Sequence, residues 1–263
     1  MTETERVQRA QAGDRAALDQ LVHQAKDLVF NLAVRMLGNP TDAEDVSQEI
    51  LIRVVTSLST FRGESAFRTW VYRIAANHLM RAKKEGQKEQ TFEAIEEYLD
   101  VGIAADLPPL EDQRLVTEAR LVCTSKMVTS LDRDHRLAFV LGEVFELSSE
   151  EGASALEITP EAFRKRLSRA RERIGEFMAK RCGLFDPKLP CRCAKQAANG
   201  AKAGRLTHES ARLTALGCRP RPAAAESEAV TELEKVAAIF KSHPDYAGPE
   251  SLISGLKTLL ARP

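Results

Sequence analysis

The stretch SSEEGASALEITPEAFRKRLSRARERI, residues 148–174, predicts a short helix, a tight turn and a second, basic helix. Ser148 or Ser149 can cap the first helix, because a hydroxyl oxygen accepts hydrogen bonds from the backbone N–H groups left unpaired at a helix start. Pro160 falls at the first position of the second helix, where its missing N–H costs nothing. The apolar residues of that helix recur at helical spacing and share one buried face: Phe163, Leu167, Ala170 and Ile174.

The opposite face of the second helix is basic. A short helix, a tight turn and a basic second helix match the helix-turn-helix, whose second helix enters the major groove of DNA. Arginines there can contact guanine edges or phosphates, and the sequence leaves both open. The alternative is a solvent-facing basic helix in a bundle. The predicted DNA-binding residues of this helix are Arg164, Lys165, Arg166, Ser168, Arg169 and Arg171.

Charge is segregated along a chain whose 38 basic and 38 acidic residues give a net charge of zero. Residues 62–88 carry seven Lys or Arg against two acids, and residues 164–181 carry eight against two. Residues 93–118 between them hold eight acids and one Arg. Two basic blocks joined by an acidic connector indicate two modules that bind polyanions.

The first basic block is FRGESAFRTWVYRIAAN, residues 61–77, in which aromatic residues alternate with arginines. Aromatic faces can stack on unpaired bases while cations follow the backbone, a combination suited to melted DNA. The alternative is that Trp70 and Tyr72 fill a helical core. The predicted DNA contacts in this block are Phe61, Arg62, Glu64, Ser65, Arg68, Trp70 and Arg73, with the loop residues best placed to hold an extruded base.

Upstream of this block, DAEDVSQEILIRVVTSL, residues 42–58, predicts a helix capped by Thr41 or Asp42 after the break at Asn39-Pro40. Val46, Ile50, Val54 and Leu58 share one stripe of this helix and are expected to be buried. Its other face presents Asp42, Glu44, Asp45, Gln48 and Glu49. No stretch shows sustained strand alternation, so the sequence predicts an all-α protein.

Both blocks resemble a known family. DAEDVSQEILIRV with STFRGESAFRTWVYRIAANHL is similar to region 2 of extracytoplasmic-function (ECF) sigma factors, and residues 130–174 resemble their region 4. The resemblance implies a subunit that binds the clamp and flap of bacterial RNA polymerase core. The acidic face of residues 42–49 would dock the clamp, Phe61–Asn77 would open and read the promoter −10 element, and Arg164–Arg171 would read the −35 element. Asn77 joins the predicted DNA contacts on this basis alone.

Three residues depart from the family pattern. Region 4 begins Leu131-Asp132 instead of Leu-Pro, Ala162 replaces a small hydroxylic residue, and Glu157 replaces the turn glycine. Glu157 is expected either to deform the turn or to adopt ordinary dihedral angles. The expected domains are region 2 (10–90), an acidic linker with room for a short helix (91–117), region 4 (118–180), a Cys-containing loop (181–221) and a helical C-terminal extension (222–263).

Three of the five cysteines cluster just after the basic helix, in CGLFDPKLPCRC. Cys182, Cys191 and Cys193, with Cys218 further on, could bind a soft ion such as Cu, Zn or Cd. The alternatives are a structural zinc staple, unliganded reduced thiols, or thiols made oxidisable by basic neighbours that lower their pKa. Cys123 lies in an apolar helical context and is expected to be a packed core thiol.

A Cys-rich tail behind an ECF sigma factor resembles the metal-responsive CorE type, and this resemblance implies that the extension replaces a separate anti-sigma factor. No required cofactor is expected. The rival interpretation is a helix-turn-helix regulator with a metal- or redox-sensing tail, which leaves the acidic helix and the aromatic-basic block without a role. Scattered histidines and the lack of a phosphate-binding glycine loop argue against an enzyme. No signal peptide or membrane span is recognisable, so a cytoplasmic protein is expected.

Overall fold

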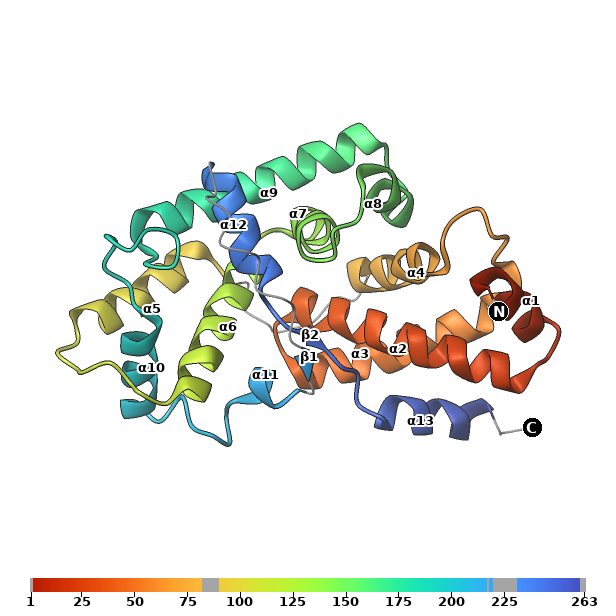
Figure 1. Ribbon diagram of the computed structural model, residues 1–263, viewed down its shortest axis with the longest axis horizontal. Coiled ribbons are helices and arrows are strands. Elements are labelled where there is room, and N and C mark those ends of the chain that lie inside the picture. Colours follow the sequence, from red (N-terminus) through yellow and green to blue (C-terminus); the bar gives the residue numbers. More distant parts are fainter. Residues whose placement is uncertain (1, 82–89, 217, 220–230, 261–263) are drawn as a thin grey trace. The chain divides into compact units, whose positions relative to one another are not determined.

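The computed structural model describes residues 2–81, 90–216, 218–219 and 231–260, and helices dominate this part of the chain (Figure 1). The prediction of an all-α fold is confirmed, since the strands are two residues long: β1 (Cys218–Arg219) pairs with β2 (Asp245–Tyr246). None of the helices in these residues is both long and apolar enough to cross a membrane.

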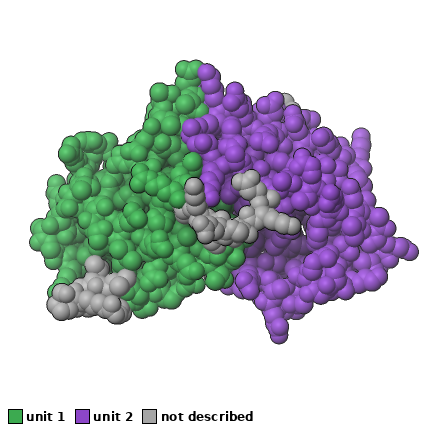
Figure 2. All heavy atoms as spheres, turned by 180° about the vertical axis from the view of Figure 1, so that it is seen from behind, with its two compact units in different colours: residues 1–84, 147–163, 246–263 green, residues 85–146, 164–245 purple. Residues whose placement is uncertain are grey.

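The chain divides into two compact units (Figure 2). Unit 1 comprises residues 1–84, 147–163 and 246–263, and unit 2 comprises residues 85–146 and 164–245. Unit 1 contains α1 (Glu3–Gln11), α2 (Arg15–Leu37), α3 (Pro40–Thr56), η1 (Leu58–Thr60), α4 (Phe67–Arg81), α8 (Ser149–Leu156) and α13 (Ser251–Leu260). Unit 2 contains α5 (Phe92–Ala104), α6 (Gln113–Thr129), α7 (Arg133–Phe139), the π-helical turn η2 (Val140–Val144), α10 (Cys193–Lys202), α11 (Arg212–Ala215) and α12 (Glu232–Lys241). The helix α9 (Pro160–Arg181) begins in unit 1 and continues in unit 2.

The core of unit 1 is formed by the apolar faces of α2, α3 and α4. The two long helices α2 and α3 are separated by a short turn, because Gly38 adopts the left-handed conformation (φ 67°) that ends α2. The prediction that Thr41 or Asp42 caps α3 is wrong. Pro40 is the first residue of the helix and Asn39 is the cap, its Oδ1 accepting the N–H of Thr41 at 3.0 Å.

The N-terminal helix α1 fixes the loop between α3 and α4. Gln11 Nε2 donates to the carbonyl oxygens of Leu58 and Phe61, both at 2.9 Å. Glu3 Oε1 accepts the N–H of Phe67 at 2.9 Å, which satisfies a backbone donor at the start of α4. Gln11 and Glu3 therefore hold the two ends of the loop that is predicted to contact single-stranded DNA. Nothing in the sequence indicated this role for either residue.

In unit 2 the acidic segment predicted as a linker contains a helix, α5. Its side chains Ile95 and Leu99 are buried, and the Nε2 of Gln196 in α10 donates to the carbonyl oxygen of Leu99 at 2.9 Å. The fully buried carboxylate of Glu118 in α6 accepts the N–H groups that begin α11. The acidic stretch is thus packed against α6 and α10 over residues 92–104 and is not an extended tether there.

The C-terminal extension contributes one helix to each unit. In unit 2, Phe240 of α12 packs edge-on against Phe139, with ring centroids 5.0 Å apart and planes at 88°. Lys241 Nζ lies 2.9 Å from Glu146 Oε1 beside this contact. In unit 1, α13 packs on α2 and α3. Each of the two C-terminal helices thus packs within a different unit of the chain.

Candidate polymerase-docking and DNA-binding surfaces

The five predicted polymerase-docking residues lie together on α3. Asp45 and Glu49, one helical turn apart, are exposed. Asp42, Glu44 and Gln48 are half-buried. Of the four residues predicted to be buried, Ile50 and Val54 are buried on α3 and Leu58 is buried in η1, whereas Val46 is only half-buried. One helix therefore presents a band of carboxylates that a basic surface on a partner could recognise.

Three members of this band contact other parts of unit 1. Glu49 Oε2 lies 3.1 Å from His78 Nε2 in α4. The pKa of His78 is lowered, first by burial and then by Arg53, while Glu49 opposes both effects. Glu44 accepts a hydrogen bond from the hydroxyl of Ser251 in α13 at 2.5 Å, and Gln48 lies against the backbone of the same helix. Asp45 is the exposed carboxylate of the band for which no such contact is found among the described residues.

The loop between η1 and α4 begins with an aromatic cluster. The ring centroid of Trp70 lies 5.3 Å from that of Phe61 and 5.8 Å from that of Phe67. Trp70 is only 3% exposed, so its ring fills the core, as the alternative interpretation of this block anticipated. Arg62 and Glu64 are exposed on the loop, where Gly63 takes a φ of 75°. The loop residues, and not Trp70, are accessible to an unpaired base.

Two of the predicted base-reading residues in α4 are bonded to α8. Arg68 Nη2 lies 2.5 Å from Glu151 Oε1, and Asn77 Nδ2 donates to Glu157 Oε2 at 3.1 Å. The hydrogen bond from Arg68 is the main reason that the pKa of Glu151 is lowered. Arg73 is half-buried in the same helix. Arg68 and Asn77 of α4 are thus hydrogen-bonded to the first helix of the helix-turn-helix and to the turn that follows it.

The helix-turn-helix is present, and its turn explains the departure at Glu157. Ser148 forms a capping box with Glu151 at the start of α8, as the capping prediction required. Glu157 has φ 54° and ψ 41°, the left-handed conformation that a glycine would adopt more easily. The turn is therefore neither deformed nor built from ordinary dihedral angles. The hydrogen bond from Asn77 is one contact that holds this residue in its place.

The predicted buried face of α9 is confirmed, since Phe163, Leu167, Ala170 and Ile174 are all at most 9% exposed. Phe163 also explains a glycine in the preceding helix. A Cβ atom on Gly152 would overlap the ring of Phe163, so α8 and α9 can approach this closely only with glycine at that position.

The six predicted DNA contacts of α9 divide into two groups. Arg164, Lys165, Ser168 and Arg169 are exposed. Arg166 Nη1 lies 2.8 Å from Asp134 Oδ1, and Arg171 pairs with Glu143, whose side chain is 1% exposed. The first group lies at the surface of the helix, whereas Arg166 and Arg171 tie α9 to the rest of unit 2.

Four cysteines line one small cavity of about 30 Å³ in unit 2. Cys182 and Cys191 are brought together by two backbone hydrogen bonds, Gly183 N–H to Cys191 O at 3.1 Å and Cys191 N–H to Arg181 O at 3.0 Å. Cys193 begins α10. Cys123 of α6, expected to be a packed core thiol, lies at the same cavity. The side chain of Cys218 lies outside the described residues.

Burial controls the chemistry of these thiols. It raises the pKa of Cys191 to about 11 and also raises the pKa values of Cys123 and Cys193. The alternative that basic neighbours lower the thiol pKa values is wrong for Cys191 and Cys193, since burial outweighs the opposing effects of Arg192 on Cys191 and of Arg120 on Cys193. Among the described residues, no three His, Cys, Asp or Glu side chains are placed to hold a metal ion.

Buried polar residues on α2 escaped the sequence analysis. Lys26, Asn31 and Arg35 are each less than 9% exposed in an otherwise apolar helix face. Polar residues at such positions require partners, because burying an unpaired polar group is costly. Their position within an apolar stripe was the available signal, but the sequence could not reveal that the partners come from residues 246–250.

Comparisons with known proteins match both of the predicted sigma-factor regions of the chain. Family models for sigma-70 region 2 and sigma-70 region 4 match residues 21–89 and 121–174. The RNA polymerase sigma-H factor of Pseudomonas aeruginosa is 33% identical over 177 residues, which cover 65% of this chain and 91% of that protein. The ECF RNA polymerase sigma-E factor of Escherichia coli K12 is 34% identical over 179 residues, covering 66% and 93%. The solved sigma factor RpoE of Bartonella quintana, in complex with the anti-sigma factor NepR, has a TM-score of 0.42 and 20% identity, covering 62% of this chain and 96% of that one.

Proposed function

Because the chain belongs to the ECF family of RNA polymerase sigma factors, which are initiation factors and not enzymes, we propose that it binds bacterial core polymerase and directs initiation at promoters with matching −10 and −35 elements. The observation that carries this proposal is the combination of an acidic band on α3, in which Asp45 and Glu49 are exposed, with a basic helix-turn-helix later in the same chain. A DNA-binding regulator needs only the second of these features.

Region 2 would make two kinds of contact. Asp42, Glu44, Asp45, Gln48 and Glu49 would meet the clamp of the polymerase through the face of α3. The loop residues Arg62, Glu64 and Ser65, with Phe61, would hold an extruded base of the −10 element, while Arg68, Arg73 and Asn77 would contact the strand. Since Arg68 and Asn77 are bonded to Glu151 and Glu157, α8 must leave α4 before these two side chains can reach DNA.

Region 4 would bind the polymerase flap and insert α9 into the major groove at the −35 element. Its exposed residues Arg164, Lys165, Ser168 and Arg169 would make the first contacts. Arg166 and Arg171 would orient the helix through Asp134 and Glu143.

The test is run-off transcription with purified core polymerase on a library of genomic promoters. A sigma factor yields transcripts that require both the core enzyme and this protein. A helix-turn-helix regulator instead binds a DNA site without core enzyme and gives no transcript with core alone, and that result would refute the proposal.

The extension is proposed to act in place of a separate anti-sigma factor. Residues beyond 174 lie past the match to the region 4 model, yet they pack on both units of the chain. In the Bartonella quintana structure the anti-sigma factor is a separate protein. Co-purification of this chain with a stoichiometric inhibitor protein from its own cells would contradict a substitute role for the extension.

We also propose that a soft metal ion binds at the cysteine cavity. The donor chemistry fits, because four thiols from different segments meet at one cavity, and the three that follow α9 are joined to the basic helix by Arg181. Among the described residues the thiols do not form a ready site, so binding requires their side chains to rearrange. Cu(I), Zn or Cd bound there would tie Cys182, Cys191 and Cys193 to Cys123 or Cys218.

Equilibrium dialysis of the reduced protein against each metal tests this directly. Stoichiometric binding that is lost on Cys191→Ser and on Cys193→Ser is the expected result. Comparison of Cys123→Ser with Cys218→Ser then identifies the fourth ligand. Binding that survives all four changes would exclude the cavity as the site.

A further inference from the structure

The chain that follows β2 runs along α2 and is fixed there by buried polar contacts. Asn31 Oδ1 accepts the N–H of Tyr246 at 3.0 Å, and Asn31 Nδ2 donates to the carbonyl oxygen of the same residue at 3.0 Å. The guanidinium of Arg35 lies 4.8 Å above the ring of Tyr246 and donates to Asn31 Oδ1 at 2.6 Å. This pairing satisfies both backbone groups of Tyr246 through one buried amide, so the position of the segment is specific.

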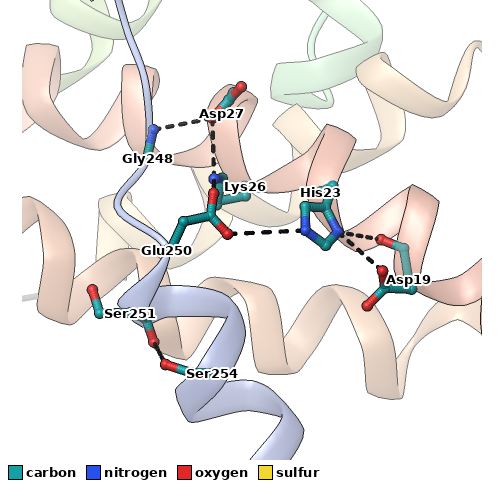
Figure 3. A network of polar contacts seen from close by, with 8 residues as sticks. All are labelled: Asp19, His23, Lys26, Asp27, Gly248, Glu250, Ser251 and Ser254. Atoms are coloured by element: carbon teal, nitrogen blue, oxygen red, sulfur yellow. Dashed lines mark hydrogen bonds and ion pairs between the residues drawn. The ribbon is translucent and has the colours of Figure 1, made fainter. Parts of the chain in front are cut away.

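A second set of contacts lies one to two turns toward the N-terminus of α2 (Figure 3). Gly248 N–H donates to Asp27 Oδ1 at 3.0 Å, and Lys26 pairs with the carboxylate of Glu250. His23 Nε2 lies 4.0 Å from the other oxygen of Glu250. Lys26 is almost fully buried, with a side chain 7% exposed, so Glu250 supplies a charge partner that this ammonium group needs.

The helix that follows, α13, buries apolar side chains against α2 and α3. Ile253 and Leu256 form a buried cluster with Val22 of α2, and the half-buried Leu18, Ile52 and Val55 pack around it. Removal of these two apolar side chains from water favours the docked position of α13. The apolar contact and the polar contacts together form a continuous seam from Tyr246 to Leu256.

This seam overlaps the acidic band of α3. The hydroxyl of Ser251 donates to Glu44 Oε1 at 2.5 Å. A Cβ atom on Gly255 would lie 2.7 Å from Gln48 Nε2, so the backbone of α13 lies directly on the Gln48 amide. Two of the five residues proposed to dock polymerase are therefore in contact with the chain's own C-terminal helix.

We propose that residues 246–260 are an intramolecular competitor of RNA polymerase: α13 occupies the part of the α2–α3 surface that the core enzyme needs, and the two bind it in alternation. This inference rests on the proposed function, because it concerns the same face of α3. It assigns the inhibitory role to one short segment, which is separate from the cysteine cavity of unit 2. Polymerase binds only the fraction of molecules in which α13 is detached, so its apparent affinity falls by that fraction.

The test compares core-polymerase affinity of full-length variants by anisotropy. Ile253→Asp combined with Leu256→Asp puts charges into the apolar cluster and detaches α13. Glu250→Ala is a milder variant that leaves Lys26 without this partner. Leu233→Asp is the matched control, since Leu233 is an exposed apolar residue of α12 in the other unit. Hydrogen exchange of α3 reports detachment in each protein, whether or not polymerase binds.

The double variant, in which α13 is detached, is expected to bind core polymerase at least about tenfold more tightly than the wild type. Glu250→Ala should bind it about threefold more tightly than the wild type, and Leu233→Asp should bind it as tightly as the wild type does. A synthetic peptide of residues 245–260 added in trans should reverse the gain. The competitor role is overturned if the double variant shows faster hydrogen exchange in α3 but binds core polymerase no more tightly than the wild type. That result leaves the proposed sigma-factor function unaffected. No core binding by any variant, with the same exchange result, refutes the proposed function itself.

Discussion

The carboxylate of Glu151 joins α4, which carries proposed −10 contacts, to α8, the first helix of the helix-turn-helix. One oxygen lies 2.5 Å from Arg68 Nη2 in α4, and the other accepts the N–H of Ser148 at the start of α8, at 2.9 Å. Both elements belong to unit 1, in which α8 packs directly on α4. A single acidic side chain thus caps a helix of the helix-turn-helix and occupies an arginine of region 2.

Replacement of Glu151 by Gln should make folding stability less sensitive to acid. Bonding to Arg68 holds the pKa of Glu151 below its usual 4.5, so the carboxylate stabilises the fold above that pH. This stabilisation is lost as the pH falls through the lowered folded pKa. The pair is partly exposed, so its contribution is only about 0.2–1 kcal/mol. Urea unfolding between pH 7 and pH 3 measures the effect, and Glu150→Gln, an exposed neighbour, is the control.

Charge reversal of Asp45 should weaken core-polymerase binding by about tenfold or more without changing the fold. Asp45 is exposed, so a lysine there costs little stability but places like charges at a basic partner surface. Glu49 is a poorer probe because it also contacts His78. The affinity should be measured in the wild type and in the α13-detached background. Glu97→Lys, on the exposed surface of α5, is the matched control. Unchanged affinity of Asp45→Lys would contradict the docking assignment.

Arg164→Ala and Arg169→Ala should each lower the salt dependence of promoter binding by polymerase that carries this protein. An arginine on a phosphate releases about one counterion, so the slope of log K against log salt falls by about 1. An arginine that reads guanine would instead relax specificity at one base pair. Lys180→Ala, at the exposed C-terminal end of the same helix, should leave both quantities unchanged. Slopes that match the wild type for both arginine variants would argue against α9 as the DNA-contacting helix.

Arg171→Ala should destabilise unit 2 far more than Arg166→Ala. The partner of Arg171 is Glu143, whose side chain is 1% exposed. Removal of the Arg171 guanidinium therefore leaves the buried Glu143 carboxylate without this cation. We expect a cost of about 2–4 kcal/mol. Asp134, the partner of Arg166, is 48% exposed, so that variant should lose less than about 1 kcal/mol. Denaturant unfolding compares the two, and equal losses would rule out a special role for the Glu143 pair.

Alkylation of Cys191 should be slow at neutral pH. Burial raises its pKa to about 11, and only the thiolate reacts with iodoacetamide, so the rate should keep rising until the pH approaches that value. The same cysteine in the urea-unfolded chain is the reference. Mass spectrometry of peptides quantifies the reaction. Reaction at pH 7 as fast as in the unfolded chain would contradict the buried, protonated thiol.

The features that were predicted correctly depend on local periodicity. Phe163, Leu167, Ala170 and Ile174 are buried because their spacing matches one face of a helix, whatever the rest of the chain does. The predicted cap of α3 was two or three residues too late, since Asn39, Thr41 and Asp42 can all cap a helix and only the backbone path selects among them. Helix ends are decided by small local energies, whereas helix faces are decided by many apolar side chains together.

The features that were missed depend on contacts between distant segments. Nothing near Trp70 in the sequence distinguishes a ring that stacks on a base from one that packs on Phe61 and Phe67. The alternative of oxidisable thiols considered only the basic neighbours of Cys191 in the chain, whereas burial is the main cause of its pKa and raises it. Likewise, the acidic band of α3 was predicted from the sequence, but its contact with α13 was not. That contact joins residues 207 positions apart, such as Glu44 and Ser251.

That separation of 207 positions also sets an order of events during synthesis. Ribosomes add about 5–20 residues per second, so roughly 10–40 s pass between the addition of Glu44 and of Ser251. Until α13 has emerged, α2 and α3 of the nascent chain have no cover over Val22 and Gln48. A newly translated molecule therefore has a brief period in which it can load onto polymerase before its own last helix closes the surface. Under the competitor proposal, the rate of translation, as well as any chemical signal, determines how much of this protein reaches the transcription machinery.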